Sequence, residues 1–234
     1  MKSIFFDAGP VISLSTNNLL WSLARLKSRY NGHFYFSAAV KKELIDTPYN
    51  SKRFKFEAIQ VMKAVEQGVF EITPADKTAK LAKKLLDLAN NIYLAKGTGV
   101  RIVHRGEIDS LAGAEIMSSE AVVIDERTTR MLIESPEELK TLVENKLHTP
   151  VKIQSENLEN FRKMTSEIRI IRSSELVAVA YELGIFDEYL LKVPEAGRQL
   201  LDGLLWGVKL NGCAVSREEI DKIINFELKK QKSI

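Results

Sequence analysis

Two short, wholly apolar runs that each end in an aspartate constrain the fold of this chain most strongly. Ile4-Phe5-Phe6 leads into Asp7, and Ala121–Ile124 leads into Asp125. An unbroken apolar run of this length is typical of a strand in a sheet that is covered on both faces. Helical patterns separate the two runs, so we expect the strands to pair in parallel through crossover connections. Both aspartates then emerge at the same edge of one sheet.

Between these two strands, short β-rich runs alternate with longer helical patterns. Further strands are expected at 33–36 and 69–72, and helices at 17–30, 38–45, 54–67, 75–91 and 107–118. Thr73 and Pro74 support the start of the fourth helix, since threonine caps helices and proline fits the first helical position. The alternation predicts an α/β fold over residues 1–134, a three-layer α/β/α sandwich with a central parallel sheet.

The pattern changes after about residue 134. Ser135–Glu138 and Ser216–Glu219 are both capping boxes, which start helices. Helical patterns continue at 157–168, 174–183, 196–210 and 218–230, whereas strand signals are sparse. We therefore predict a helical C-terminal extension over residues 135–234, packed on the first domain or on a partner.

Composition limits the class of protein. Hydrophobic residues make up 45% and charged residues 28% of the 234 residues, an ordinary balance for a globular protein. The longest apolar runs are too short to span a bilayer, and we see no signal peptide, so no membrane partner is expected. The single cysteine, Cys213, cannot form an internal disulfide, which favours the reducing cytoplasm. A net charge of +3 neither demands nor excludes a polyanionic partner.

Acidic residues stand where a metal site would need them. Asp7 and Asp125 end strands, Glu43 lies in the helix after the second strand, and Glu107 and Asp109 open the helix before the last strand. Carboxylates that share one cleft repel each other, and burial penalises each charge further. A hard divalent cation relieves both effects, and an all-oxygen site suits Mg²⁺ or Mn²⁺. Such a site can activate water for hydrolysis of a phosphodiester, with one metal or with two.

Each acid also has an ordinary structural explanation. Asp7 and Asp125 can cap the segments that follow them, and Glu43 can lie on a helix surface. Glu107 and Asp109 both suit the positive end of a helix. The metal-site interpretation is favoured because two of the acids end strands of the same expected sheet.

Three arginines lie close to these acids in the sequence. Arg127 and Arg130 stand one helical turn apart beside Asp125, and Arg105 precedes Glu107. They can hold the phosphates of a bound strand or simply face solvent. Another basic run is expected to be an exposed helix face: Lys52, Arg53 and Lys55.

Four ordered blocks of the chain resemble the PIN-domain ribonucleases. The blocks are Asp7–Ile12, Val40–Leu44, Gly106–Ala112 and Val122–Arg127, and the resemblance covers roughly residues 1–133. It implies a parallel sheet between helices, an acidic cluster that binds magnesium or manganese, and cleavage of single-stranded RNA. Matched position by position, it implicates Asp7, Glu43, Asp125 and either Glu107 or Asp109.

Two departures from the family pattern stand out. Many relatives carry serine or threonine two residues after the first aspartate, where this chain has Gly9. The third block offers two acids, and its Gly-Glu-x-acid form resembles an archaeal and bacterial subset, so Glu107 is the first choice and Asp109 is retained. Beside RNA, the resemblance leaves open two protein partners, an antitoxin-like inhibitor and a second copy of the chain in a homodimer.

Other functional classes fit less well. A haloacid-dehalogenase-type phosphatase needs a second aspartate two residues after the first, at the position of Gly9. Nucleotide-binding proteins need a glycine-rich phosphate loop, and none follows the first strand. A non-catalytic PIN-like module that binds RNA or protein stays open, because a fold does not establish an activity.

Overall fold

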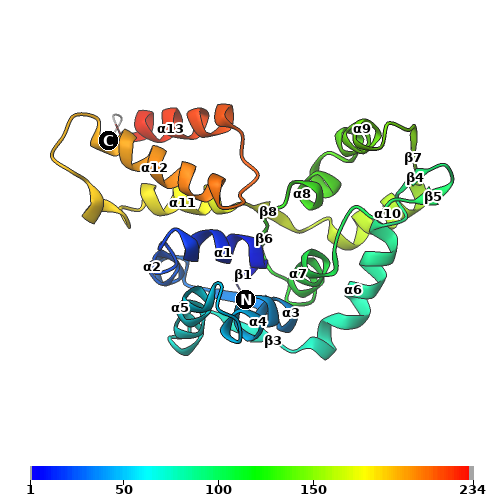
Figure 1. Ribbon diagram of the computed structural model, residues 1–234, viewed down its shortest axis with the longest axis horizontal. Coiled ribbons are helices and arrows are strands. Elements are labelled where there is room, and N and C mark those ends of the chain that lie inside the picture. The colour runs from blue at the N-terminus through cyan, green and yellow to red at the C-terminus, as the bar shows by residue number, and fades with distance from the viewer. Residues whose placement is uncertain (1, 232–234) are drawn as a thin grey trace.

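The computed structural model describes residues 2–231 and is built around a five-stranded parallel sheet (Figure 1). The strand order is β3-β2-β1-β6-β8, and every neighbouring pair is parallel. The strands are β1 (Ser3–Phe6), β2 (His33–Ser37), β3 (Glu71–Thr73), β6 (Ala121–Val123) and β8 (Arg169–Ile171). Helices cover both faces of the sheet, which confirms the predicted α/β three-layer sandwich.

The helices of the amino-terminal part alternate with the strands. They are α1 (Ala8–Thr16), α2 (Ser22–Tyr30), α3 (Ala38–Lys41), the π-helix η1 (Lys42–Asp46), α4 (Thr47–Tyr49), α5 (Lys55–Glu66), α6 (Ala75–Ala89) and α7 (Arg105–Ile116). Successive side chains of β1 point to opposite faces of the sheet. Phe6 therefore joins the core under α1, α2 and α5, while Phe5 joins the core under α6 and α7.

The rest of the chain forms two groups of helices that are well separated in Figure 1. One group borders a small antiparallel sheet of order β5-β4-β7. Its elements are β4 (Tyr93–Ala95), β5 (Thr98–Gly99), α8 (Arg127–Glu134), α9 (Pro136–Leu147), β7 (Val151–Ile153) and α10 (Ser155–Thr165). The other group lies on the side of the sheet covered by α1 and consists of α11 (Ser173–Glu182), the 3-10 helix η2 (Asp187–Tyr189), α12 (Ala196–Leu210) and α13 (Arg217–Gln231).

Residues after 134 are mainly helical, as predicted, but the prediction missed two strands there. β7 joins the small sheet, and β8 pairs in parallel with β6 to form one edge of the central sheet. Each has three residues, too few to show an alternating pattern. The core containing Phe6 and Val11 also contains Leu176 and Ile224, so packing continues across the predicted boundary. Within residues 2–231, no helix combines the length and the apolar character needed to cross a membrane.

Helix α7 packs directly on the central strand. A Cβ atom added to Gly113 of α7 would overlap the ring of Phe5 on β1. Only the absence of a side chain at this position allows the helix to lie so close to the sheet.

We predict that Gly113→Ala lowers the free energy of unfolding by about 1–3 kcal/mol, because the added methyl group overpacks the core. Gly203→Ala is the matched control, since a Cβ at this exposed position in α12 meets nothing within 4 Å. It should raise the free energy of unfolding by about 0.5–1 kcal/mol through helix propensity. Urea denaturation of both variants measures these changes. Equal effects at the two positions would contradict the close packing of α7 on β1.

Candidate active site

Asp7 ends β1 and is the N-cap of α1. Its Oδ2 accepts a hydrogen bond from the backbone N–H of Gly9 at 3.5 Å, and its Oδ1 accepts one from the Ser110 hydroxyl at 3.1 Å. The helices expected from the sequence began only at residue 17, and none was expected directly after Asp7. The structure corrects this, because Gly9 and Pro10 lie in the first turn of α1, where proline is tolerated. Only 8% of Asp7 is exposed.

Gly9 lies where the carboxyl ends of β1 and β6 meet. A Cβ atom at this position would lie 3.7 Å from Asp7 Oδ2 and 3.8 Å from the Cβ of Asp125. The two strand-end aspartates are therefore neighbours, as the parallel pairing predicted. Position 9 has no hydroxyl, and the hydroxyl that contacts Asp7 is that of Ser110, from α7.

Glu43 and Glu107 approach the same point from two helices. Glu43 lies in the π-helix η1, and its Oε2 is 3.8 Å from where a Cβ of Gly106 would be, at the start of α7. Glu107, the next residue, accepts a 2.6 Å hydrogen bond from the backbone N–H of His104. Glycine at position 106 leaves the space beside the Glu43 carboxylate free.

Asp7, Glu43 and Glu107 lie near enough for their charges to affect one another, although they are not grouped tightly as they stand. Burial raises the pKa of Asp7 to about 6, the hydrogen bond from Ser110 opposes this, and the charge of Glu43 adds to it. Burial also raises the pKa of Glu107 to about 7, with contributions from Asp7, Glu126 and Glu43. The pKa of Glu43 is raised by burial. Within residues 2–231, none of the three is in an ion pair.

The two remaining predicted acids are held by other partners. Both oxygens of Asp125 accept hydrogen bonds from Ser173, Oδ1 from the backbone N–H at 2.7 Å and Oδ2 from the hydroxyl at 2.8 Å. Asp109 pairs with Arg105 at 3.6 Å. Of the two acids in the third block, Glu107 is therefore the one whose charge acts on the Asp7 cluster.

The donor chemistry of the cluster fits a hard divalent cation. Asp7, Glu43 and Glu107 offer carboxylate oxygens, the ligands that Mg²⁺ and Mn²⁺ prefer, and Gly9 and Gly106 leave room beside two of them. As they stand, however, no three His, Cys, Asp or Glu side chains in the described part of the chain are grouped so that they could hold a metal ion. A shared ion requires these carboxylates to rotate toward one another.

The three predicted phosphate-binding arginines have different surroundings. The guanidinium of Arg105 forms an ion pair with Asp109. Arg130 lies 4.0 Å from both Glu134 and Glu219. Arg127 is exposed at the start of α8. Arg127 is thus the most available of the three to a phosphate.

Sequence reasoning missed the residues that hold Asp125 in place. Arg172, next to Ser173, is 7% exposed and donates to Glu175 at 2.6 Å and to Glu219 at 2.7 Å. Burial disfavours the charge of Glu219, but hydrogen bonds from Ser216 and Arg172 lower its pKa to about 2. Glu219 was expected only as part of the Ser216–Glu219 capping box, which the structure contains. No sequence signal pointed to Arg172 or Ser173, because β8, which leads into Arg172, was not recognised.

Comparisons of the chain with family models, with curated proteins and with solved structures found no match. The assignment of a function therefore depends on the chemistry of this chain's own residues.

The raised pKa of Asp7 predicts a pH-dependent stability. An unfolded aspartate has a pKa of about 3.8 and the folded one of about 6, so the metal-free protein loses stability as pH rises through this window. Asp7→Asn removes the buried charge. In EDTA it should unfold with a free energy up to about 3 kcal/mol higher than wild type at pH 7.5, and with a similar free energy at pH 3.5. Urea denaturation at both pH values tests this; an equal difference at the two would contradict it.

Proposed function

We propose that this protein is a metal-dependent endoribonuclease that hydrolyses phosphodiester bonds of single-stranded RNA. One observation carries the proposal. Asp7 beside Gly9, Glu43 beside Gly106 and Glu107 lie near enough to affect one another's charge. They do so at the carboxyl end of the central strand of a parallel sheet, where ligand sites of such sheets lie, and within residues 2–231 no cation pairs with them. A cluster of this kind is costly for stability alone, and is typical of functional sites. The resemblance to PIN-domain ribonucleases supports the same activity.

Asp7, Glu43 and Glu107 are the residues that would hold Mg²⁺ or Mn²⁺. A bound ion supplies Lewis-acid stabilisation of the phosphodiester and activates water. Ser110 orients Asp7 through Oδ1, while Oδ2 accepts the longer, 3.5 Å hydrogen bond from Gly9 and is the oxygen more available to an ion.

Glu107 is the carboxyl group of the proposed site that carries a proton when no cation is bound. With its pKa raised to about 7, this carboxyl is substantially protonated at neutral pH until a cation is bound, so metal binding should release protons.

Asp125 has a supporting role in this proposal. Ser173 occupies both of its oxygens, so it borders the site beside Gly9 and stays turned toward α11. Arg127 is the proposed phosphate contact. The lone Cys213 is in keeping with action in the cytoplasm. An antitoxin-like inhibitor and a homodimer remain expectations from the family resemblance.

We predict that cleavage of a fluorogenic single-stranded RNA requires Mn²⁺ or Mg²⁺ and stops when EDTA is added. Asp7→Asn and Glu107→Gln should each reduce the rate at least about 100-fold, because each removes a donor of the cluster. Asp109→Asn is the matched control on the same helix. Its carboxylate faces Arg105, so the rate should stay within a few-fold of wild type.

Three outcomes would count against the proposal. Cleavage that persists in both Asp7→Asn and Glu107→Gln would indicate a contaminating nuclease. A larger loss in Asp109→Asn than in Glu107→Gln would move the site to the other acid of α7. RNA binding without cleavage at any metal concentration would favour the non-catalytic PIN-like binding module.

A further inference from the structure

A basic segment with exposed aromatic rings follows the π-helix that carries Glu43. This segment, Tyr49–Lys55, is termed here the aromatic–basic loop; it contains three cations, and no acidic residue occurs from 47 to 56. Two aromatic side chains, Tyr49 and Phe54, are each 42% exposed. The sequence alone suggested only an exposed basic helix face here.

The cations of the loop lie over its aromatic rings. Lys55 Nζ is 5.1 Å from the centre of the Tyr49 ring, and the guanidinium of Arg53 is 4.6 Å from the centre of the Phe54 ring. In the described part of the chain, ion pairs form at other lysines and arginines, such as Lys41 with Asp46, but not at the cations of this loop. The loop therefore places positive charge on one face of each ring, while both residues stay 42% exposed.

The conformation of the loop is set before any ligand binds. Phe54 has φ +60°, a left-handed conformation that a bulky residue adopts only when its surroundings hold it there. The Ser51 hydroxyl donates to the Arg53 carbonyl at 2.6 Å, and the Asn50 amide donates to the Asp46 carbonyl at 2.8 Å. Little ordering entropy is then lost on binding.

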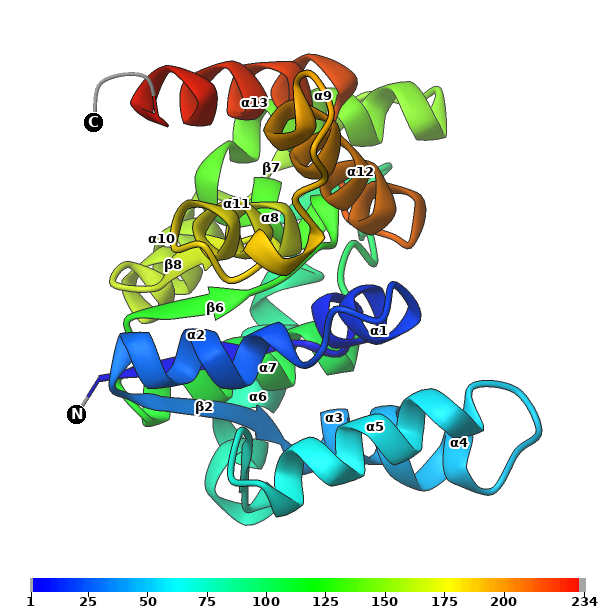
Figure 2. The same ribbon diagram turned by 90° about the vertical axis from the view of Figure 1, so that its left-hand side faces the viewer.

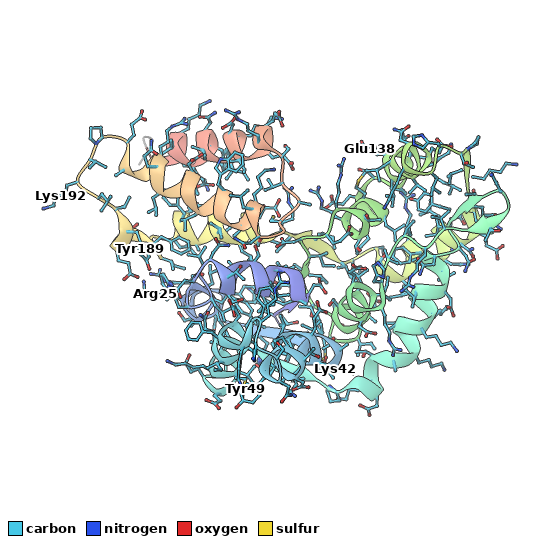
Figure 3. All side chains as sticks on the ribbon, viewed as in Figure 1. Arg25, Lys42, Tyr49, Glu138, Tyr189 and Lys192 are labelled. Atoms are coloured by element: carbon cyan, nitrogen blue, oxygen red, sulfur yellow. The ribbon has the colours of Figure 1, made fainter. Side chains whose placement is uncertain are left out.

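The loop is rigidly connected to the acidic cluster. Helices α3, η1 and α4 follow one another without a break, and Tyr49 lies six positions after Glu43, about 9 Å along the axis at the α-helical rise. Figure 2 shows the connection between α4 and α5 projecting beyond the carboxyl ends of the strands, on the same side as α1. Figure 3 labels Lys42, the neighbour of Glu43, and Tyr49, and both lie in the lower part of the view, where α3, α4 and α5 are found. π-Helical turns of this kind are frequent at functional sites.

We propose that the aromatic–basic loop is a binding platform for the bases of a single-stranded nucleic acid, beside the acidic cluster. Tyr49 and Phe54 stack on unpaired bases, and Lys52, Arg53 and Lys55 contact the phosphates. Rings combined with a positive surface are the chemistry that non-specific single-strand binding uses. A duplex hides its base faces, so the platform selects single strands. The choice of RNA as ligand rests on the proposed function, but binding to the loop needs no catalysis.

Fluorescence anisotropy in EDTA, where no metal-dependent cleavage occurs, tests the proposal. The probes are a labelled 12-nucleotide single-stranded RNA and an abasic strand of equal length, which keeps the phosphates but lacks bases. Tyr49→Ala should weaken RNA binding by roughly 5- to 100-fold and leave abasic-strand binding nearly unchanged. Phe54→Gly should do the same. Glycine accepts a positive φ, so loss of binding in this variant cannot be ascribed to backbone strain.

Phe226→Ala is the matched control. Phe226 lies on α13, is 59% exposed, and has Lys230 Nζ 5.4 Å from its ring centre. It has an exposed ring with a cation over it, but this cation is paired with Glu182 and lies away from the acidic cluster. Removal of the Phe226 ring should therefore leave RNA affinity unchanged. Circular dichroism melts of all three variants establish that they are folded.

The proposal would be overturned if both loop variants bound the single-stranded RNA as tightly as wild type does. It would also be overturned if the wild-type protein bound the abasic strand, or duplex RNA, as tightly as the single-stranded RNA. Its failure is distinguishable from that of the ribonuclease assignment. RNA binding that depends on the loop, without cleavage at any metal concentration, would support the binding platform and contradict the ribonuclease assignment. Metal-dependent cleavage with an unchanged KM in Tyr49→Ala and Phe54→Gly would support the ribonuclease assignment and contradict the binding platform.

Discussion

The burial of the Asp7 carboxylate at the end of the central strand is the constraint on which the site depends. β1 lies between β2 and β6, and its last two residues, Phe5 and Phe6, are fully buried on opposite faces. The chain must leave the sheet at Asp7, whose backbone N–H is still bonded to the Val123 carbonyl at 3.0 Å. A carboxylate held there is desolvated, so its surroundings have to supply hydrogen bonds or a counter-ion. Ser110 supplies part of this stabilisation, and we infer that a divalent cation supplies the rest.

The carboxy-terminal region is part of this arrangement. β8 extends the central sheet next to β6, and the chain then turns into α11 at Ser173, which holds both oxygens of Asp125. Arg172, the residue before Ser173, also connects the start of α11 to α13, because it donates a hydrogen bond to Glu219. Removing the half-exposed carboxylates of Glu175 and Glu219 would leave the buried Arg172 guanidinium without compensation. The strand-end aspartate of β6 is thus positioned by residues that follow it by almost fifty positions, not by its own sequence neighbours.

One continuous helical segment connects two local excesses of charge, the acids around Asp7 and the aromatic–basic loop. The acidic cluster lacks cations, and the aromatic–basic loop lacks acids. A nucleic-acid strand with a divalent ion would satisfy both, because its phosphates match the loop and the ion matches the carboxylates. The net charge of +3 does not reveal that positive and negative charges are separated on the molecule. The local distribution of charge determines whether a polyanion is attracted.

Much of the fold was readable from the sequence by itself. Apolar strands separated by helices required parallel pairing, and parallel pairing required Asp7 and Asp125 to meet at one edge. The order of strands, the direction of each carboxylate and the partners of Asp125 were decided only by the tertiary structure. Ser110 and Ser173 lie 103 and 48 residues from the aspartates they contact, and β8 has too few residues to show a period. The local pattern of apolar and polar residues indicates which face of a helix or strand is buried. Contacts between side chains that are distant in the sequence depend on how the helices and strands pack.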